Sequence, residues 1–140
     1  MDKVISKKYL DELTYKVIGA AIEVHKELGP GLLESVYQRC FFEELRMRNV
    51  YFKSQLIIPI KYKQLELDAE LRCDFFVDDC LVVEIKAVDA MIPVYDAQVM
   101  TYMKLLKVPK GILINFNVYN LFKEGQKTFV NELFRSLPEE

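Results

Sequence analysis

The 140-residue sequence contains no tryptophan, one histidine, three cysteines, five glycines and five prolines. So little glycine and proline excludes a collagen-like or low-complexity chain. The cysteines are odd in number and form no CxxC pair, which argues against a disulfide framework or structural zinc site and favours a reducing compartment. No apolar run approaches the ~18 residues of a membrane span, and the first residues lack the apolar core of a signal peptide. We therefore expect a soluble, cytoplasmic protein with no membrane partner.

A strong charge of either sign is also absent, since the net charge is −2 at pH 7. This balance excludes a strongly basic protein that coats nucleic acid without specificity, but it leaves room for a local basic groove. Apolar residues make up 51% of the chain, including nine phenylalanines and eight tyrosines. That content excludes disorder, and the length suffices for one self-supporting core. We expect a single domain over residues 1–140.

The spacing of apolar residues changes from a helical period to a period of two and back. The expected elements are helices over residues 10–28 and 32–49, strands over 52–62, 65–77 and 81–88, a helix over 93–107 and a strand over 112–114. Pro59 indicates an edge strand or a bulge, and a short strand near Leu121 with a turn at Gly125 should precede a final strand or helix. The order α-α-β-β-β-α-β predicts an α+β (mixed α/β) fold, a mixed sheet flanked by helices.

The strand over residues 65–77 alternates without a gap, so we expect one packed face and one wet or functional face. A three-residue loop at Asp78-Asp79-Cys80 would place Asp74 directly opposite Glu84, with Cβ atoms roughly 4.5–5.5 Å apart. Two carboxylates that close repel each other unless a cation lies between them. A two-residue loop would break this register, and Asp74 would then be one more acid on the wet face.

Glu84 and Lys86 share one face of an otherwise apolar strand, because residues two apart on a strand point the same way. They could form a charge pair at the sheet surface, but Val82 and Val88 on the same face favour the wall of a cleft.

Glu34 lies within a helical apolar stripe, on the face of Tyr37, Phe41 and Leu45. A carboxylate there needs a partner, a metal or a proton. The alternative is a first-turn acid that interacts with the helix dipole and still touches water.

Two carboxylates and a nearby backbone carbonyl are ligands that suit Mg²⁺ or Mn²⁺. Such an ion could activate water, and Lys86 could orient that water or neutralise charge on a phosphate. This layout predicts metal-assisted hydrolysis of a phosphodiester. Gln98 and Tyr102, four apart on a predicted helix, could position a nucleic-acid backbone, or Gln98 could simply face solvent and Tyr102 be half-buried.

Six segments, in order, resemble a known family. Residues 31–37, Gly-Leu-Leu-Glu-Ser-Val-Tyr, resemble the signature of the GxxExxY proteins, which are placed in the PD-(D/E)XK nuclease superfamily. The other segments are the lead-in at residues 24–31, Arg72-Cys73-Asp74, Glu84-Ile85-Lys86-Ala87, the QxxxY motif of RecB-like nuclease domains at residues 98–102, and a last core strand at residues 111–116. The resemblance implies a restriction-endonuclease-like core. Cys73 stands where the superfamily nominally has proline.

The resemblance also implies roles for individual residues. Asp74, Glu84 and the carbonyl of Ile85 would hold Mg²⁺ or Mn²⁺, with Glu34 contributing to the metal shell. Lys86 would be the catalytic lysine, and Gln98 and Tyr102 would complete the site. Nuclease domains of this kind that hold an iron–sulfur cluster use four cysteines, so we expect no cluster from the three present.

Two functions follow from these patterns. The first is a divalent-metal-dependent nuclease whose partner is nucleic acid, with DNA ahead of RNA. The second is a nonenzymatic module with a nuclease-like fold and an unused site, since a fold does not determine a function. A protein partner or a homodimer remains open.

Overall fold

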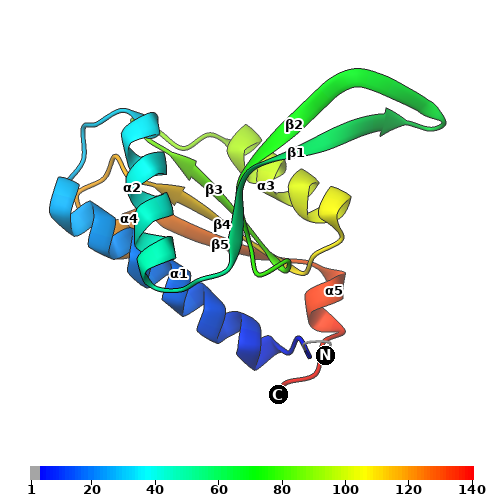
Figure 1. Cartoon of the computed structure of the whole chain (residues 1–140), viewed down its shortest axis with the longest axis horizontal. Coiled ribbons are helices and arrows are strands. Elements are labelled where there is room, and N and C mark those ends of the chain that lie inside the picture. The colour runs from blue at the N-terminus through cyan, green and yellow to red at the C-terminus, as the bar shows by residue number, and fades with distance from the viewer. Residues whose placement is uncertain (1–3) are drawn as a thin grey trace.

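The computed structural model describes residues 4–140 and contains one five-stranded sheet between helices (Figure 1). The strands, in sheet order, are β1 (Phe52–Tyr62), β2 (Leu65–Val77), β3 (Leu81–Lys86), β4 (Lys110–Asn115) and β5 (Gln126–Val130). The helices are α1 (Lys7–Leu28), α2 (Glu34–Met47), α3 (Pro93–Leu106) and the single turns α4 (Leu121–Glu124) and α5 (Glu132–Arg135). β3 and β4 are parallel and the other neighbouring strands are antiparallel. The predicted fold class is confirmed.

The helices bury their apolar stripes on opposite faces of the sheet. α1 and α2 cover one face, where Tyr37, Phe41 and Leu45 are fully buried against strand residues such as Phe75. α3 covers the other face, where Val99 and its neighbours pack on Val82 and Leu113. None of the helices within residues 4–140 is long and apolar enough to cross a bilayer.

The chain reverses between α1 and α2 through two glycines with positive φ. Gly29 caps α1 with φ 69° and donates its N–H to the carbonyl of His25, and Gly31 has φ 97°. L-residues with a side chain rarely adopt such angles. The turn brings the start of α2, and with it Glu34, to the end of the sheet.

α3 lies unusually close to β4 at Gly111. A Cβ on Gly111 would be 2.6 Å from Cγ1 of Val99 and 2.9 Å from Sδ of Met103. Real side chains do not pack at such distances, so the helix can approach the strand this closely only because position 111 has no side chain.

β1 and β2 continue past the rest of the sheet as a two-stranded ribbon, which we call the arm (residues 57–72; Figure 1). Lys63 and Gln64 form the turn at its tip, and β1 is an edge strand with a register shift between Pro59 and Lys61, as Pro59 indicates. The expectation that all of β2 has one packed face is wrong for its outer half, because residues 65–70 are exposed on both faces. Periodicity shows that a strand is two-faced but not whether another layer covers it.

The expected strand near Leu121 is also wrong, because residues 121–124 form the helical turn α4. The side chain of Asn120 accepts a hydrogen bond from the N–H of Lys123, which is a typical N-cap interaction. Gly125 ends the turn, and the final segment supplies both a strand, β5, and a helical turn, α5.

Candidate metal-dependent active site

The candidate site lies where β2 and β3 separate, at the root of the arm. The pairs Phe75–Val83 and Val77–Leu81 give the register produced by a three-residue loop, so Asp74 continues it opposite Glu84. The predicted juxtaposition is therefore confirmed. Neither Asp74 nor Glu84 belongs to the hydrogen-bonded ladder between the two strands, which ends at the pair Phe75–Val83.

Side chains replace the backbone ladder at this point. The N–H of Asp74 donates to Oε2 of Glu84 at 2.6 Å, and the N–H of Ile85 donates to Oδ2 of Asp74 at 2.9 Å. Each carboxylate is thereby tied to the backbone of the opposite strand. One oxygen of each, Oδ1 of Asp74 and Oε1 of Glu84, takes no part in these two bonds.

The two carboxyl groups perturb each other electrostatically. Glu84 is only 4% exposed, and burial followed by the negative charge of Asp74 raises its pKa to about 8. Burial also raises the pKa of Asp74, against the lowering effect of its hydrogen bond from Ile85 and of Lys86. A buried like-charge pair of this kind favours either a shared proton or a bound cation.

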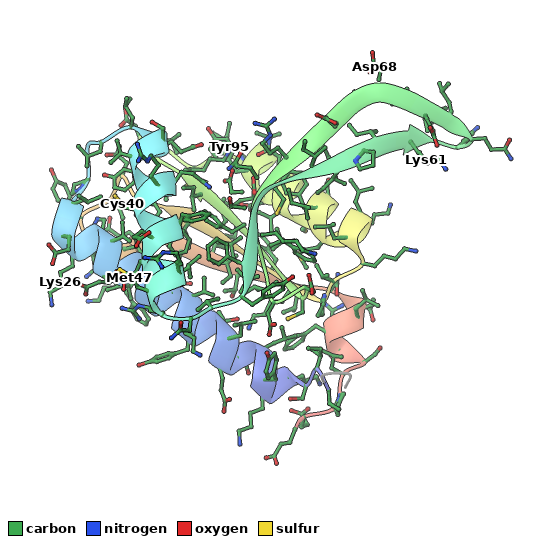
Figure 2. All side chains as sticks on the ribbon, in the orientation of Figure 1. Lys26, Cys40, Met47, Lys61, Asp68 and Tyr95 are labelled. Carbon is green, nitrogen blue, oxygen red and sulfur yellow. The ribbon has the colours of Figure 1, made fainter. Side chains whose placement is uncertain are left out.

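Lys86 lies beside this pair, at the end of β3. Its charge lowers the pKa of Asp74, Glu84 and Glu34, and its Nζ lies 4.6 Å from the ring centroid of Tyr95. The aromatic face supports the ammonium by a cation–π contact rather than by a competing carboxylate. Figure 2 shows Tyr95 close to the root of the arm.

The carbonyl of Ile85 faces the side of β3 on which Asp74 lies. The carbonyl of Lys86 accepts from the N–H of Phe116 on the β4 side, and successive strand residues present their backbone groups to opposite sides. The N–H of Ile85 bonds to Asp74, so its carbonyl points the same way. This is the position that the predicted metal ligand requires.

Glu34 is exposed at the start of α2, so the apolar stripe of that helix begins one turn later at Tyr37. Partial burial and then the charge of Asp74 raise the pKa of Glu34, while Lys86 lowers it. Glu34 is therefore a first-turn acid in contact with water, and its charge contributes to raising the pKa of Glu84.

Tyr37 positions this first turn. Its ring stacks on Phe116, with centroids 4.6 Å apart, directly after β4. Its hydroxyl donates to the carbonyl of Gly29 at 2.6 Å and accepts from the N–H of Leu32 at 3.2 Å. The loop that presents Glu34 is thereby fixed to the sheet.

The two polar residues predicted on α3 have different environments. Tyr102 is 6% exposed, and burial followed by the charge of Glu84 raises its pKa to about 12, so its hydroxyl lies within the field of the site. Gln98 is half-buried, and no hydrogen bond joins it to the other predicted site residues. The structure thus brings Tyr102 toward the pair more clearly than Gln98.

Gln55 was missed by the sequence analysis. It lies in β1 opposite Asp74, at a gap in the pairing between Ser54–Phe75 and Leu56–Cys73, and has φ 51°. Its Nε2 is 3.4 Å from Oδ1 of Asp74. Left-handed backbone is uncommon for glutamine and is a recurrent feature of functional sites. No residue pattern marks it, because its place depends on a local break in the strand pairing.

The donor set fits a hard divalent cation. Oxygen atoms from two carboxylates and one carbonyl are the ligands that Mg²⁺ and Mn²⁺ prefer, and a cation would relieve the repulsion within the buried pair. Within residues 4–140, however, no three His, Cys, Asp or Glu side chains are already gathered as a metal site. Glu34 therefore does not join Asp74 and Glu84 in a ready-made three-carboxylate cluster.

Comparison with known proteins agrees with this geometry. Residues 11–129 match the family described as the PD-(D/E)XK nuclease superfamily, a segment that contains Asp74, Glu84 and Lys86. No curated protein and no solved structure gives a match to the chain. Because the family match spans well over half of the sequence, the chain belongs to the PD-(D/E)XK nuclease superfamily.

Proposed function

We propose that the protein is a divalent-metal-dependent nuclease that hydrolyses phosphodiester bonds, acting as a single domain. The observation that carries the proposal is the pairing of Asp74 with Glu84 at a break in the sheet, beside Lys86, whose ammonium lies over the ring of Tyr95. Superfamily membership supports a nuclease-like domain. Mg²⁺ or Mn²⁺ is the proposed ion, because both bind oxygen ligands and retain water.

Each residue has a role that follows from its place. A bound Mg²⁺ or Mn²⁺ supplies Lewis-acid activation of water and of the phosphate. Asp74, Glu84 and the carbonyl of Ile85 hold the ion, and Glu34 adds negative charge to its outer shell. The Lys86 ammonium, held over Tyr95, stabilises negative charge that develops on the phosphate.

The helix α3 completes the site in this proposal. Tyr102 offers a protonated hydroxyl near the carboxylates, since its pKa is raised to about 12. Gln98, one turn earlier and half-buried, orients the substrate backbone.

The finer family and substrate assignments rest on resemblance. The segment Gly31 to Tyr37 supports membership of the GxxExxY group, and the segment Gln98 to Tyr102 supports a RecB-like site. For this reason we propose DNA as the substrate ahead of RNA. The fixed turn before Glu34 is consistent with a motif whose glycine and tyrosine position its glutamate.

A cleavage screen tests this function. Purified protein is incubated with single- and double-stranded DNA and RNA in the presence of Mg²⁺ or Mn²⁺, beside Glu84→Gln and Lys86→Met. We expect cleavage by the wild type, loss of Mn²⁺ binding and cleavage in Glu84→Gln, and loss of cleavage with retained Mn²⁺ binding in Lys86→Met. Glu12→Gln and Lys16→Met make the same chemical changes at exposed positions of α1 and should cut at the wild-type rate.

The second candidate function is a nonenzymatic module with a nuclease-like fold. One observation favours it: within residues 4–140 no third acidic ligand is gathered beside the carboxylate pair. Mn²⁺ binding without cleavage of any nucleic acid in the screen would support this module, and absence of both would count against a metal site altogether.

A further inference from the structure

The arm has one apolar and one charged face. The pairs Ile58–Leu71 at its root and Tyr62–Leu65 at its tip place these side chains on one face, because alternate residues of a strand point the same way. Between root and tip the register shifts by two residues, between Pro59–Glu70 and Lys61–Glu66, and a shift by an even number leaves alternate residues on the same face. We call the outer part of this surface the apolar face; it consists of Ile60, Tyr62, Leu65, Leu67 and Ala69.

This apolar face continues the core of the domain but has no cover within the described chain. At the root, Ile58 is 5% exposed and packs with Val99 and Met103 of α3. Further out, Tyr62, Leu65 and Leu67 are 61%, 59% and 40% exposed. A two-stranded ribbon is at best marginally stable alone in water, so a surface packed against the apolar face would stabilise the arm.

The opposite face of the arm is charged and needs no cover. It carries Glu66, Asp68 and Glu70 on β2, with Lys61 paired across from Glu66. Figure 2 shows Asp68 pointing away from the body of the domain.

These two faces disfavour nucleic acid as the occupant of the arm. On the charged face, three carboxylates would repel phosphates, and the ammonium beside the apolar face, that of Lys63, lies at the tip, 5.4 Å from the ring centroid of Tyr62. The five side chains of the apolar face carry no charge themselves and are best covered by another apolar β-face, since no charge is then buried without a partner. A second copy of the chain supplies such a face.

We propose that the arm is a dimerisation element in which the apolar face packs against the same face of a second copy. An isologous contact of this type needs one self-complementary patch and closes with two-fold symmetry. Each arm offers apolar surface on the order of 500 Å², so two faces approach the ~1,000 Å² of a specific interface. Because β2 leads from the arm directly into Asp74, dimerisation would also hold the strand that carries a site residue. The proposal does not depend on nuclease activity.

The test compares two double variants on the same strand. Leu65→Thr with Leu67→Thr changes the apolar face, and Glu66→Thr with Asp68→Thr places the same residue type on the charged face. Sedimentation velocity from low micromolar to several hundred micromolar protein should show a dimer for the wild type and the charged-face variant. The apolar-face variant should dimerise at least about tenfold more weakly.

A measurement without substitutions keeps the test independent of folding. Amide hydrogen exchange of the wild type should become slower at residues 65–71 as protein concentration rises, with no such change in α1. A wild type that is monomeric throughout, or a dimer that the charged-face variant weakens and the apolar-face variant does not, would overturn the proposal. Protection of the arm by an added DNA oligonucleotide in a monomeric protein would overturn it in favour of nucleic acid.

Discussion

Replacing Glu84 by glutamine should stabilise the metal-free protein at alkaline pH while abolishing metal binding. The pKa of Glu84 is raised from 4.5 to about 8, so the folded state holds the proton more tightly than the unfolded state does. The contribution of this carboxyl group to the free energy of unfolding is fully present below pH 4.5 and is lost as the pH rises through 8. At ~1.4 kcal/mol per unit of pKa, the loss is on the order of 5 kcal/mol. In the wild type, the N–H of Asp74 donates to Oε2 of Glu84 at 2.6 Å. A glutamine at position 84 keeps an oxygen that can accept this hydrogen bond but carries no charge.

Urea unfolding in the presence of a chelator measures this difference. The free energy of unfolding of wild-type protein should fall from about pH 5 to pH 8.5, whereas that of Glu84→Gln should change much less. Glu70→Gln removes an exposed carboxylate from the same sheet and should follow the wild type. Equal pH slopes for wild type and Glu84→Gln would refute the conclusion that a buried like-charge pair destabilises the metal-free fold.

Three further predictions concern the same site. Mn²⁺ affinity, measured by titration calorimetry, should rise by up to about tenfold per pH unit below pH 8, because the ion must displace the proton of Glu84; a pH-independent affinity would contradict the assigned ligand. In urea unfolding, the free energy of unfolding of Gln55→Gly should exceed that of Gln55→Ala by about 1 kcal/mol, since only alanine is strained at φ 51°. Both variants should lower cleavage several-fold, because they release Asp74 from the side-chain amide. Equal stabilities of the two variants would contradict a strained backbone at this position. Tyr37→Phe keeps the ring stack but loses two hydrogen bonds of the hydroxyl. The substitution should lower the free energy of unfolding by about 1–2 kcal/mol and speed amide exchange at Leu32. Unchanged exchange at Leu32 would show that the loop does not depend on the hydroxyl.

The central pair of the site was predictable because it depends on local rules. Alternation identifies β2 and β3, and a three-residue loop then sets the register that places Asp74 opposite Glu84. The two-residue spacing of Glu84 and Lys86 puts them on one face without any knowledge of the fold.

The remaining features depend on contacts between distant segments. Gln55 is an exposed polar residue in an alternating strand, and only the break in its pairing with β2 brings it to Asp74. Tyr95 reaches Lys86 because of where α3 starts, which no short-range pattern specifies. The lack of a covering layer on the arm could not be predicted either, because its residues alternate in the same way as those of a strand that packs on a core.

The missing side chain at Gly111 has a consequence for the two tyrosines that α3 brings to the candidate site. Helix and sheet are in direct contact at Val99 and Met103, so any side chain at position 111 would act as a spacer between them. Tyr95 and Tyr102 are carried by the same rigid helix, one against the ammonium of Lys86 and the other in the field of Glu84. A single methyl group on β4 would therefore shift two aromatic groups together, one relative to Lys86 and the other relative to Glu84.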